Sequence, residues 1–390
     1  MRWNKKKTEN LVLYCMVLVL SAAFLWLGGR LASGRLPELD GDTSVPVAAD
    51  VIEILDRTVE TYDLGSSGVG ESVYITFSAK VCWGPQKGQL VTALQMNDLF
   101  MAGAMEEVEA GDAVLLYYEE QAFQGLNWMM GEYRRTDMMF WVLLLFVALL
   151  LILGRFQGLH TLVSLTLTVI CLWQVFLPSV LSGYNIYFWV TICCLFVIVV
   201  TLLLVSGFSA KTACAAAGCM GGLAASGGFA LVMEKAMKLT GVLNQETAYL
   251  SQANQQYPIN MQGVIFAAIM IGALGAVMDV GLSLASALWE LRLKGKDPTG
   301  KSLWSSGFAI GRDMLGTMSN TLILAYFGSS LATILMLAAY RSSPLGLLNR
   351  ELVAVELLQM LVGSLGILLT VPATAAACVL LYPKAKTVDE

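Results

Sequence analysis

The stretch GRDMLGTMSNTLILAY, from Gly311 to Tyr326, places an arginine, an aspartate and an asparagine in a segment that is otherwise apolar enough to span a membrane. A charge at bilayer depth costs about 3 kcal/mol or more, so such a group normally faces a partner or a water-filled cavity. We therefore expect Arg312, Asp313 and Asn320 to face the interior of a helical bundle. The stretch indicates a membrane protein with a polar site inside the membrane.

The composition of the whole chain agrees with this class. Its 390 residues are 57% hydrophobic and 14% charged, with a mean hydropathy of +0.68, which is more apolar than a soluble globular protein. The net charge of -5 argues against nucleic acid as a partner, because phosphate binding needs clustered Lys and Arg. Only Cys82 of the eight cysteines lies outside the predicted spans, and His160 is the single histidine. We therefore expect no cofactor, no metal site and no disulfide framework.

The chain divides into four segments. Basic residues precede an apolar run in residues 1–32, which we interpret as a cytoplasmic N-terminus and a first transmembrane anchor, although a cleaved signal peptide remains an alternative. Residues 33–137 carry alternating apolar runs and Gly-rich breaks, which predict a small extracytoplasmic β-rich domain. Within it, EAGDAVLLYY predicts a turn and a core strand, and GPQKGQLV predicts a hairpin. Residues 138–383 predict a seven-helix transmembrane bundle, and residues 384–390 a cytoplasmic tail.

Seven apolar segments of the bundle approach or exceed the twenty residues that a helix needs to cross a membrane. We predict helices at Met138–Leu153, Leu159–Leu181, Tyr187–Val205, Lys211–Met233, Met261–Leu291, Gly307–Tyr340 and Leu352–Leu381. With the anchor, they predict an α-helical polytopic membrane protein of about eight transmembrane helices. Most basic loop residues fall on the side of the N-terminal lysines, which places both termini in the cytoplasm. The polar segment Glu234 to Asn260 lies on the opposite side and predicts a short surface helix.

Three predicted helices carry small or polar residues at helical spacing, so each has a polar face. These residues are Gly272, Gly275, Asp279, Ser283, Ser286 and Glu290, then Arg312, Asp313, Gly316, Thr317, Asn320 and Thr321, and finally Glu356, Gln359, Gly363, Gly366 and Thr370. We expect the three faces to line one shared interior. Its candidate pathway residues are Asp279, Ser283, Arg312, Asp313, Thr317, Asn320 and Glu356.

Within this interior, the helical rise places Arg312 within reach of Asp279. We expect the two to form an ion pair, because an unpaired buried ion costs far more than a pair. Asp313 would then be free to bind a cation or a proton. The glycines Gly311 and Gly316 flank the charged residues, which predicts an unwound segment there. The alternative is a buried ion cluster that only fixes the helix register. Another glycine run, around Gly218 and Gly222, predicts a close helix–helix contact.

Several long motifs resemble the YibE/F family of bacterial membrane proteins over nearly the whole chain. They are GRFQGLHTLVSL, LVSGFSAKTACAAAG, IGALGAVMDVGLSLASALWE, SGFAIGRDMLGTMSNTLILAYFGSSL and GSLGILLTVPATA. The resemblance implies an N-terminal anchor, an extracytoplasmic domain and a helical bundle in a bacterial cell membrane. It implies no particular substrate and no catalytic residue.

Two functions are compatible with these residues. The first is a transporter or permease for a small solute or ion, driven by a gradient because the chain carries no ATPase motif. The alternative is a non-transporting scaffold or sensor whose β-rich domain binds a ligand or protein. We expect no enzyme activity, since Arg312 between Asp279 and Asp313 would keep both carboxylates ionised, whereas an aspartyl dyad shares a proton. The expected partners are the lipid bilayer, the solute or ion, and a membrane protein or second copy of the chain.

Overall fold

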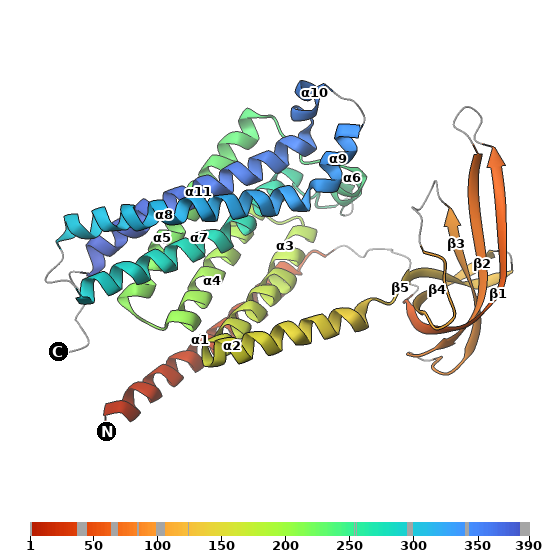
Figure 1. Cartoon of the computed structure of the whole chain (residues 1–390), viewed down its shortest axis with the longest axis horizontal. Helices are drawn as coiled ribbons and strands as arrows, with labels where there is room; N and C mark the ends of the chain where they lie inside the picture. The colour runs from red at the N-terminus through yellow and green to blue at the C-terminus, as the bar shows by residue number, and fades with distance from the viewer. Residues whose placement is uncertain are drawn as a thin grey trace. The chain divides into compact units, whose positions relative to one another are not determined.

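The structure, a computed structural model, describes residues 2–36, 45–63, 69–83, 86–98, 106–123, 125–252, 254, 256–294, 299–339 and 343–382. The chain divides into two compact units, Leu39–Leu150 and Met1–Glu38 with Leu151–Glu390. Figure 1 shows that strands make up most of the first unit and helices the second.

Five strands of the first unit close into a barrel. They are β1 (Val47–Asp63), β2 (Val69–Val81), β3 (Leu90–Asp98), β4 (Ala113–Phe123) and β5 (Leu126–Tyr133). Their order around the barrel is β1-β2-β3-β5-β4, and the β3–β5 pair is parallel while the other pairs are antiparallel. This is the strand order of the OB fold, a five-stranded Greek-key barrel. The β-rich character predicted for this part of the chain is confirmed.

The barrel core follows from the alternation of residues along β2. Ile75, Phe77 and Ala79 are buried, while the residues between them are partly exposed, because successive side chains of a strand point to opposite faces. Both predicted turns are also present. Gly88 (φ 90°) lies between β2 and β3, and Gly111 (φ 99°) lies just before β4, where glycine adopts a positive φ without a steric cost.

The helices vary widely in length. They are α1 (Arg2–Ala32), α2 (Thr136–Cys171), the π-helix η2 (Leu172–Phe176), α3 (Leu177–Leu181), α4 (Ile186–Ser206), α5 (Ala210–Ala236), α6 (Gln245–Gln252), α7 (Met261–Lys294), α8 (Gly300–Ser329), α9 (Leu331–Ala339), α10 (Pro344–Leu348) and α11 (Glu351–Leu381). Among the described residues, six helical segments are long and apolar enough to cross a membrane, with α2, η2 and α3 counted as one. Helix α8, which carries the polar stretch, is not among them. The apolar helices indicate a membrane protein, and the count of eight spans stays a prediction.

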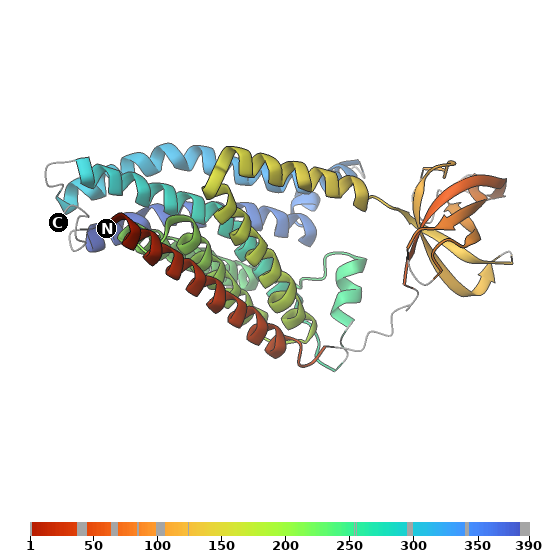
Figure 2. The same ribbon diagram turned by 90° about the horizontal axis from the view of Figure 1, so that it is seen from below.

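Two interruptions of helical structure coincide with predicted helix boundaries. Helix α2 is interrupted at Arg155, whose φ of 48° and ψ of -128° are not helical, between the predicted helices that end at Leu153 and begin at Leu159. The Asn185 side chain caps the start of α4 by accepting a hydrogen bond from the Phe188 N–H at 3.2 Å. Such caps satisfy backbone donors that have no partner within the helix. In Figure 1 and Figure 2, the start of α1 and the end of α11 lie at the same end of the helical unit.

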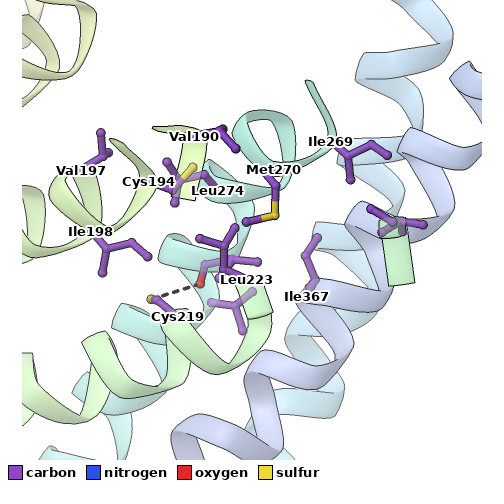
Figure 3. Packing of buried hydrophobic residues seen from close by; sticks show 14 of the residues in the cluster. Val190, Cys194, Val197, Ile198, Cys219, Leu223, Ile269, Met270, Leu274 and Ile367 are labelled. Atoms are coloured by element: carbon purple, nitrogen blue, oxygen red, sulfur yellow. Dashed lines mark hydrogen bonds between the residues drawn. The ribbon is translucent and has the colours of Figure 1, made fainter. Parts of the chain in front are cut away.

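Helix α7 forms the centre of the packed core, in contact with α4, α5, α8 and α11. Figure 3 shows its residues Met270 and Leu274 among Leu223 of α5, Cys194 of α4 and Ile367 of α11. The α5 glycines pack closely against α11, as predicted. A Cβ atom on Gly222 would overlap the Thr370 hydroxyl and lie 2.9 Å from the Gly366 carbonyl oxygen. Small residues thus let these two backbones approach, which is typical of membrane helix pairs.

Two predictions about the polar stretch are wrong. The single helix predicted from Gly307 to Tyr340 begins instead at Gly300 and ends at Ser329, and α9 follows it; Tyr340 lies outside the described residues. The Thr299 hydroxyl caps the start by accepting from the Ser302 N–H at 3.3 Å, which explains the earlier beginning. The segment GRDMLGTMSN is not unwound but continuously helical, since Gly311 is used for close packing against α11 rather than for a break.

Candidate functional site

One stripe of α7 is left exposed by the described helices of its unit. Between Gly263 and Glu290 the exposed residues are Ala268, Gly275, Asp279, Ser283 and Glu290, with Gly272 and Ser286 half-buried on the same stripe. Their spacing of three or four residues keeps them on one side of the helix. None of them is a large apolar residue, although lipid-facing stripes consist mostly of such residues. The stripe is therefore suited to water or polar groups rather than to lipid tails.

Helix α8 lies at the side of the bundle and buries only one narrow stripe. Leu303, Gly307 and Gly311 are buried, and a Cβ atom on Gly311 would overlap Val371 of α11. The polar residues of this helix lie on its other sides. The exposed ones in the middle of the helix are Arg312, Asp313, Thr317, Asn320 and Thr321.

Two close contacts set the register of the antiparallel helices α7 and α8, which pack against each other. A Cβ atom on Gly307 would lie 3.4 Å from Leu288, and one on Gly272 would overlap the Tyr326 hydroxyl. Ser319 and Arg312 precede Tyr326 by seven and fourteen residues, so they lie close to the same side of α8. Arg312 is therefore on the part of the α8 surface that borders the exposed stripe of α7.

The register also gives the relative depth of the charged residues. With a rise of about 1.5 Å per residue, Asp279 is level with Gly316 to Ser319, and Arg312 is about 6 to 10 Å away along the helix axis. Gly316 and Gly275 have open space around them, since a Cβ atom on either would have no neighbour within 4 Å. We give the name polar face to a set of exposed small and polar residues on the two helices: Gly275, Asp279, Ser283, Arg312, Asp313, Gly316, Thr317 and Asn320.

The predicted ion pair between Arg312 and Asp279 is wrong. Neither residue forms an ion pair or a side-chain hydrogen bond with a described residue, whereas Glu290 and Lys294 on α7 do pair, at 3.2 Å. The separation of one to two helical turns explains this result. Asp313, directly after Arg312, points about 100° away around the helix, so these two do not face each other either. All three charges are left without a partner from the described chain.

The polar residues of α11 have another role than predicted. Gly363, Gly366 and Thr370 are buried, and Thr370 donates its hydroxyl hydrogen to the Gly366 carbonyl at 2.7 Å. Gly366 and Thr370 form the contact with α5 described above, and Gly363 packs against Leu322 of α8. Glu356 is half-buried and close enough to Tyr326 to act on it electrostatically. Glu356 thus lies near one end of the polar face, where Tyr326 meets α7.

A sequence profile of YibE/F-like proteins matches residues 142–384, which is more than half of the chain. The chain belongs to the YibE/F-like family. Comparisons with curated proteins and with solved structures give no significant match. The polar face of this YibE/F-like protein lies within the matched segment, whereas α1 and the five strands precede it.

A cavity of about 600 Å³ lies between α1, α2 and α4 of the YibE/F-like protein. It contains the single histidine, His160, whose ring centroid is 5.0 Å from that of Tyr14. Apart from these rings and Ser206, its lining is mainly apolar. A binding site for a polar ligand needs several converging polar groups, so the polar face remains the stronger candidate.

Sequence reasoning missed one buried carboxylate, Glu234. The predicted helix ended at Met233 and the next residue was assigned to a polar surface segment, but α5 continues to Ala236 and Glu234 is only 7% exposed. Its neighbours in the sequence gave no sign of this, because Lys235 and Lys238 are both exposed. The short helix predicted in this segment is present as α6.

In the β unit, Cys82 belongs to a small charged cluster. Its thiol donates to the Asp50 carboxylate at 3.0 Å, and Arg134 pairs with Asp50 at 3.2 Å and with Asp137 at 3.1 Å. The hydrogen bond to Asp50, followed by burial and the carboxylate charge, raises the pKa of the Cys82 thiol, although Arg134 opposes the shift. The cluster therefore holds Cys82 in its unreactive, protonated form.

Replacing Asp50 with asparagine should make Cys82 more reactive. The substitution removes the negative charge and the strong acceptor, so the pKa of the thiol falls and more thiolate is present at mildly alkaline pH. We expect alkylation by iodoacetamide to become at least about twofold faster, measured on the full chain after Cys15→Ala. Asp137→Asn is the matched control, because it removes the other partner of Arg134 and leaves the thiol hydrogen bond. Equal rates in wild type and Asp50→Asn would contradict the assignment.

Proposed function

We propose that this YibE/F-like protein is a gradient-driven transporter or permease for a small solute or ion, with its path along the polar face. The observation that carries the proposal is the exposed stripe of α7, which is small or polar throughout, beside the exposed charges of α8. The proposal places the protein in a bacterial cell membrane with both termini in the cytoplasm and the barrel outside. The common position of the start of α1 and the end of α11 supports this topology (Figure 2).

The cost of exposing the polar face to lipid supports the proposal. Each of Asp279, Arg312 and Asp313 would cost about 3 kcal/mol or more in contact with lipid tails. Their sum is comparable to the entire stability of a typical folded domain, about 5–15 kcal/mol. In the membrane, this face therefore has to meet water, a polar solute or another protein surface. A second copy of the chain or a membrane-protein partner would complete the wall of such a path.

The residue types on the polar face suit small charged or zwitterionic solutes. Arg312 offers donors to an anionic group, and Asp279 and Asp313 offer acceptors to a cation. Asn320 and Ser283 add neutral hydrogen-bonding groups to this set. Gly275 and Gly316 leave open space in which a solute can approach the helix backbones. Thr317 already donates its hydroxyl hydrogen to the Met314 carbonyl at 3.0 Å, so it offers only its oxygen as an acceptor.

The second candidate is a scaffold or sensor in which the barrel binds a ligand or protein. The strand order favours it, because OB folds commonly bind extended ligands on the β2–β3 face. In this case the charges of the polar face would contact a partner protein, and neutralising them would change stability or assembly without changing flux. The same experiment therefore separates the two candidates.

Asp279→Asn should strongly reduce transport while leaving the protein folded. We expect concentration jumps of protons, alkali cations, amino acids or phosphate to produce currents from wild-type proteoliposomes on a solid-supported membrane. The current should fall at least about tenfold in Asp279→Asn, the effect of losing 1.4 kcal/mol at the rate-limiting step. Glu290→Gln is the matched control, since Glu290 lies on the same stripe but pairs with Lys294 at 3.2 Å. Equal currents from Asp279→Asn and wild type would refute the site, and a change in melting temperature alone would favour the scaffold.

A further inference from the structure

Glu234 lies in a buried site formed by three helices, away from the polar face. Its Oε1 atom accepts a hydrogen bond from the Tyr187 hydroxyl of α4 at 2.7 Å. The Tyr187 ring packs on Phe266 of α7, with 4.9 Å between the ring centroids. The Oε2 atom of Glu234 is buried and has no hydrogen-bond partner. The site thus holds one carboxylate oxygen firmly and leaves the other unpaired.

The α5–α6 loop, residues 237–244, begins directly after the helix end that carries Glu234. Lys238 adopts a φ of 52°, and the next residue, Leu239, donates its N–H to the Glu234 carbonyl at 3.2 Å. This is the arrangement of a helix C-cap with a left-handed residue, a position where glycine is the usual choice. The Leu239 side chain is buried in the core of the bundle. The loop therefore turns back sharply onto the end of α5.

Two other helices hold the α5–α6 loop in place. Gln262 of α7 donates to the Leu239 carbonyl at 2.6 Å. Glu351, the first residue of α11, accepts from the N–H groups of Thr240 at 2.5 Å and Gly241 at 2.8 Å, and from the Thr240 hydroxyl at 2.9 Å. These bonds are at or near the surface, whereas the Glu234 side chain is buried. A loop that lifts has to break these bonds and to withdraw Leu239 from the core.

The chemistry of the unpaired oxygen indicates what the site binds. An ionised carboxylate with a buried, unsatisfied oxygen is more costly than a neutral carboxyl group in the same place. A metal ion would need several more oxygen ligands, and the Oε2 atom has no polar neighbour at hydrogen-bonding distance. A proton needs one oxygen only. Among the described residues, Tyr187 is the titratable group that contacts Glu234, and Lys235 and Lys238 are exposed.

We propose that Glu234 is a proton-binding site, protonated on Oε2 when the α5–α6 loop is closed and exchanging its proton with water when the loop lifts. If the protein is a transporter, this proton would couple the gradient to solute movement. The binding site itself does not depend on that function, because its proton is detected without any flux.

Infrared spectroscopy of the full chain in lipid tests the proposal directly. Near pH 7, where exposed carboxylates are ionised, we expect a carboxylic-acid C=O band that Glu234→Gln removes. Tyr187→Phe should keep this band and shift it to higher frequency, since the carbonyl loses its hydrogen bond. This second variant gives an answer even if Glu234→Gln does not fold.

Glu351, which accepts hydrogen bonds from Thr240 and Gly241 of the loop, supplies the matched comparison. Glu351→Gln should keep the band and speed its shift on transfer to deuterated water, because the loop lifts more often. Glu290→Gln, which is remote from the loop, should change neither the band nor the exchange rate. The proposal is overturned if the wild type shows no band that depends on Glu234, or if sodium ions remove the band at constant pH, which would assign the site to a metal cation.

Discussion

Gly222→Leu is expected to yield no folded protein. Gly222 lies where α5 and α11 pack against each other through small residues. A Cβ atom at this position would overlap the Thr370 hydroxyl and lie 2.9 Å from the Gly366 carbonyl oxygen. A side chain can rotate away, but a backbone carbonyl can move only with its helix. Even Gly222→Ala should cost about 1–3 kcal/mol, the usual cost of overpacking a core. A leucine adds three more carbon atoms to the same contact.

Gly228→Ala is the matched control for this prediction. It lies on the same helix, and a Cβ atom there would have no neighbour within 4 Å. We expect its melting temperature in detergent to equal that of the wild type, that of Gly222→Ala to be lower, and Gly222→Leu to elute as aggregate in size-exclusion chromatography. Adding Thr370→Ala to Gly222→Ala should recover part of the loss, because the hydroxyl overlap is removed. A folded Gly222→Leu protein would show that the helices do not pack as described.

Sequence periodicity was sufficient to predict most of the long helices and the β-rich character of residues 45–133. Apolar runs of twenty residues and the alternation along β2 gave the helices and the barrel core, because helices and strands repeat their faces at fixed intervals. The α4 helix lies within one residue of its predicted bounds at each end. The small residues of α5 also identified a close helix contact. Each of these features depends on residues that are near one another in the chain.

The arrangement of the site was less predictable, since periodicity shows that a helix has a polar face but not which neighbour it meets. The face with Gly366 and Thr370 looked equivalent to the face with Asp279, yet the first packs on α5 and the second is exposed. The pairing of Arg312 failed for the same reason, because it depends on the register between two helices. Glu234 was missed because its burial results from a loop and two distant helices.

The most direct test of the polar face is its access to water. Cysteines introduced at Gly275, Asp279 and Ser283 would be treated with a membrane-impermeant thiol reagent in intact membranes, after Cys15 and Cys82 are replaced with alanine; the other six cysteines are buried. Val199→Cys is the control, since Val199 is exposed on the apolar helix α4. Such reagents attack the thiolate, which forms in water and not in lipid. We predict labelling of all three positions at least about tenfold faster than Val199→Cys. Labelling of all three as slow as that of Val199→Cys would contradict a water-lined path along α7.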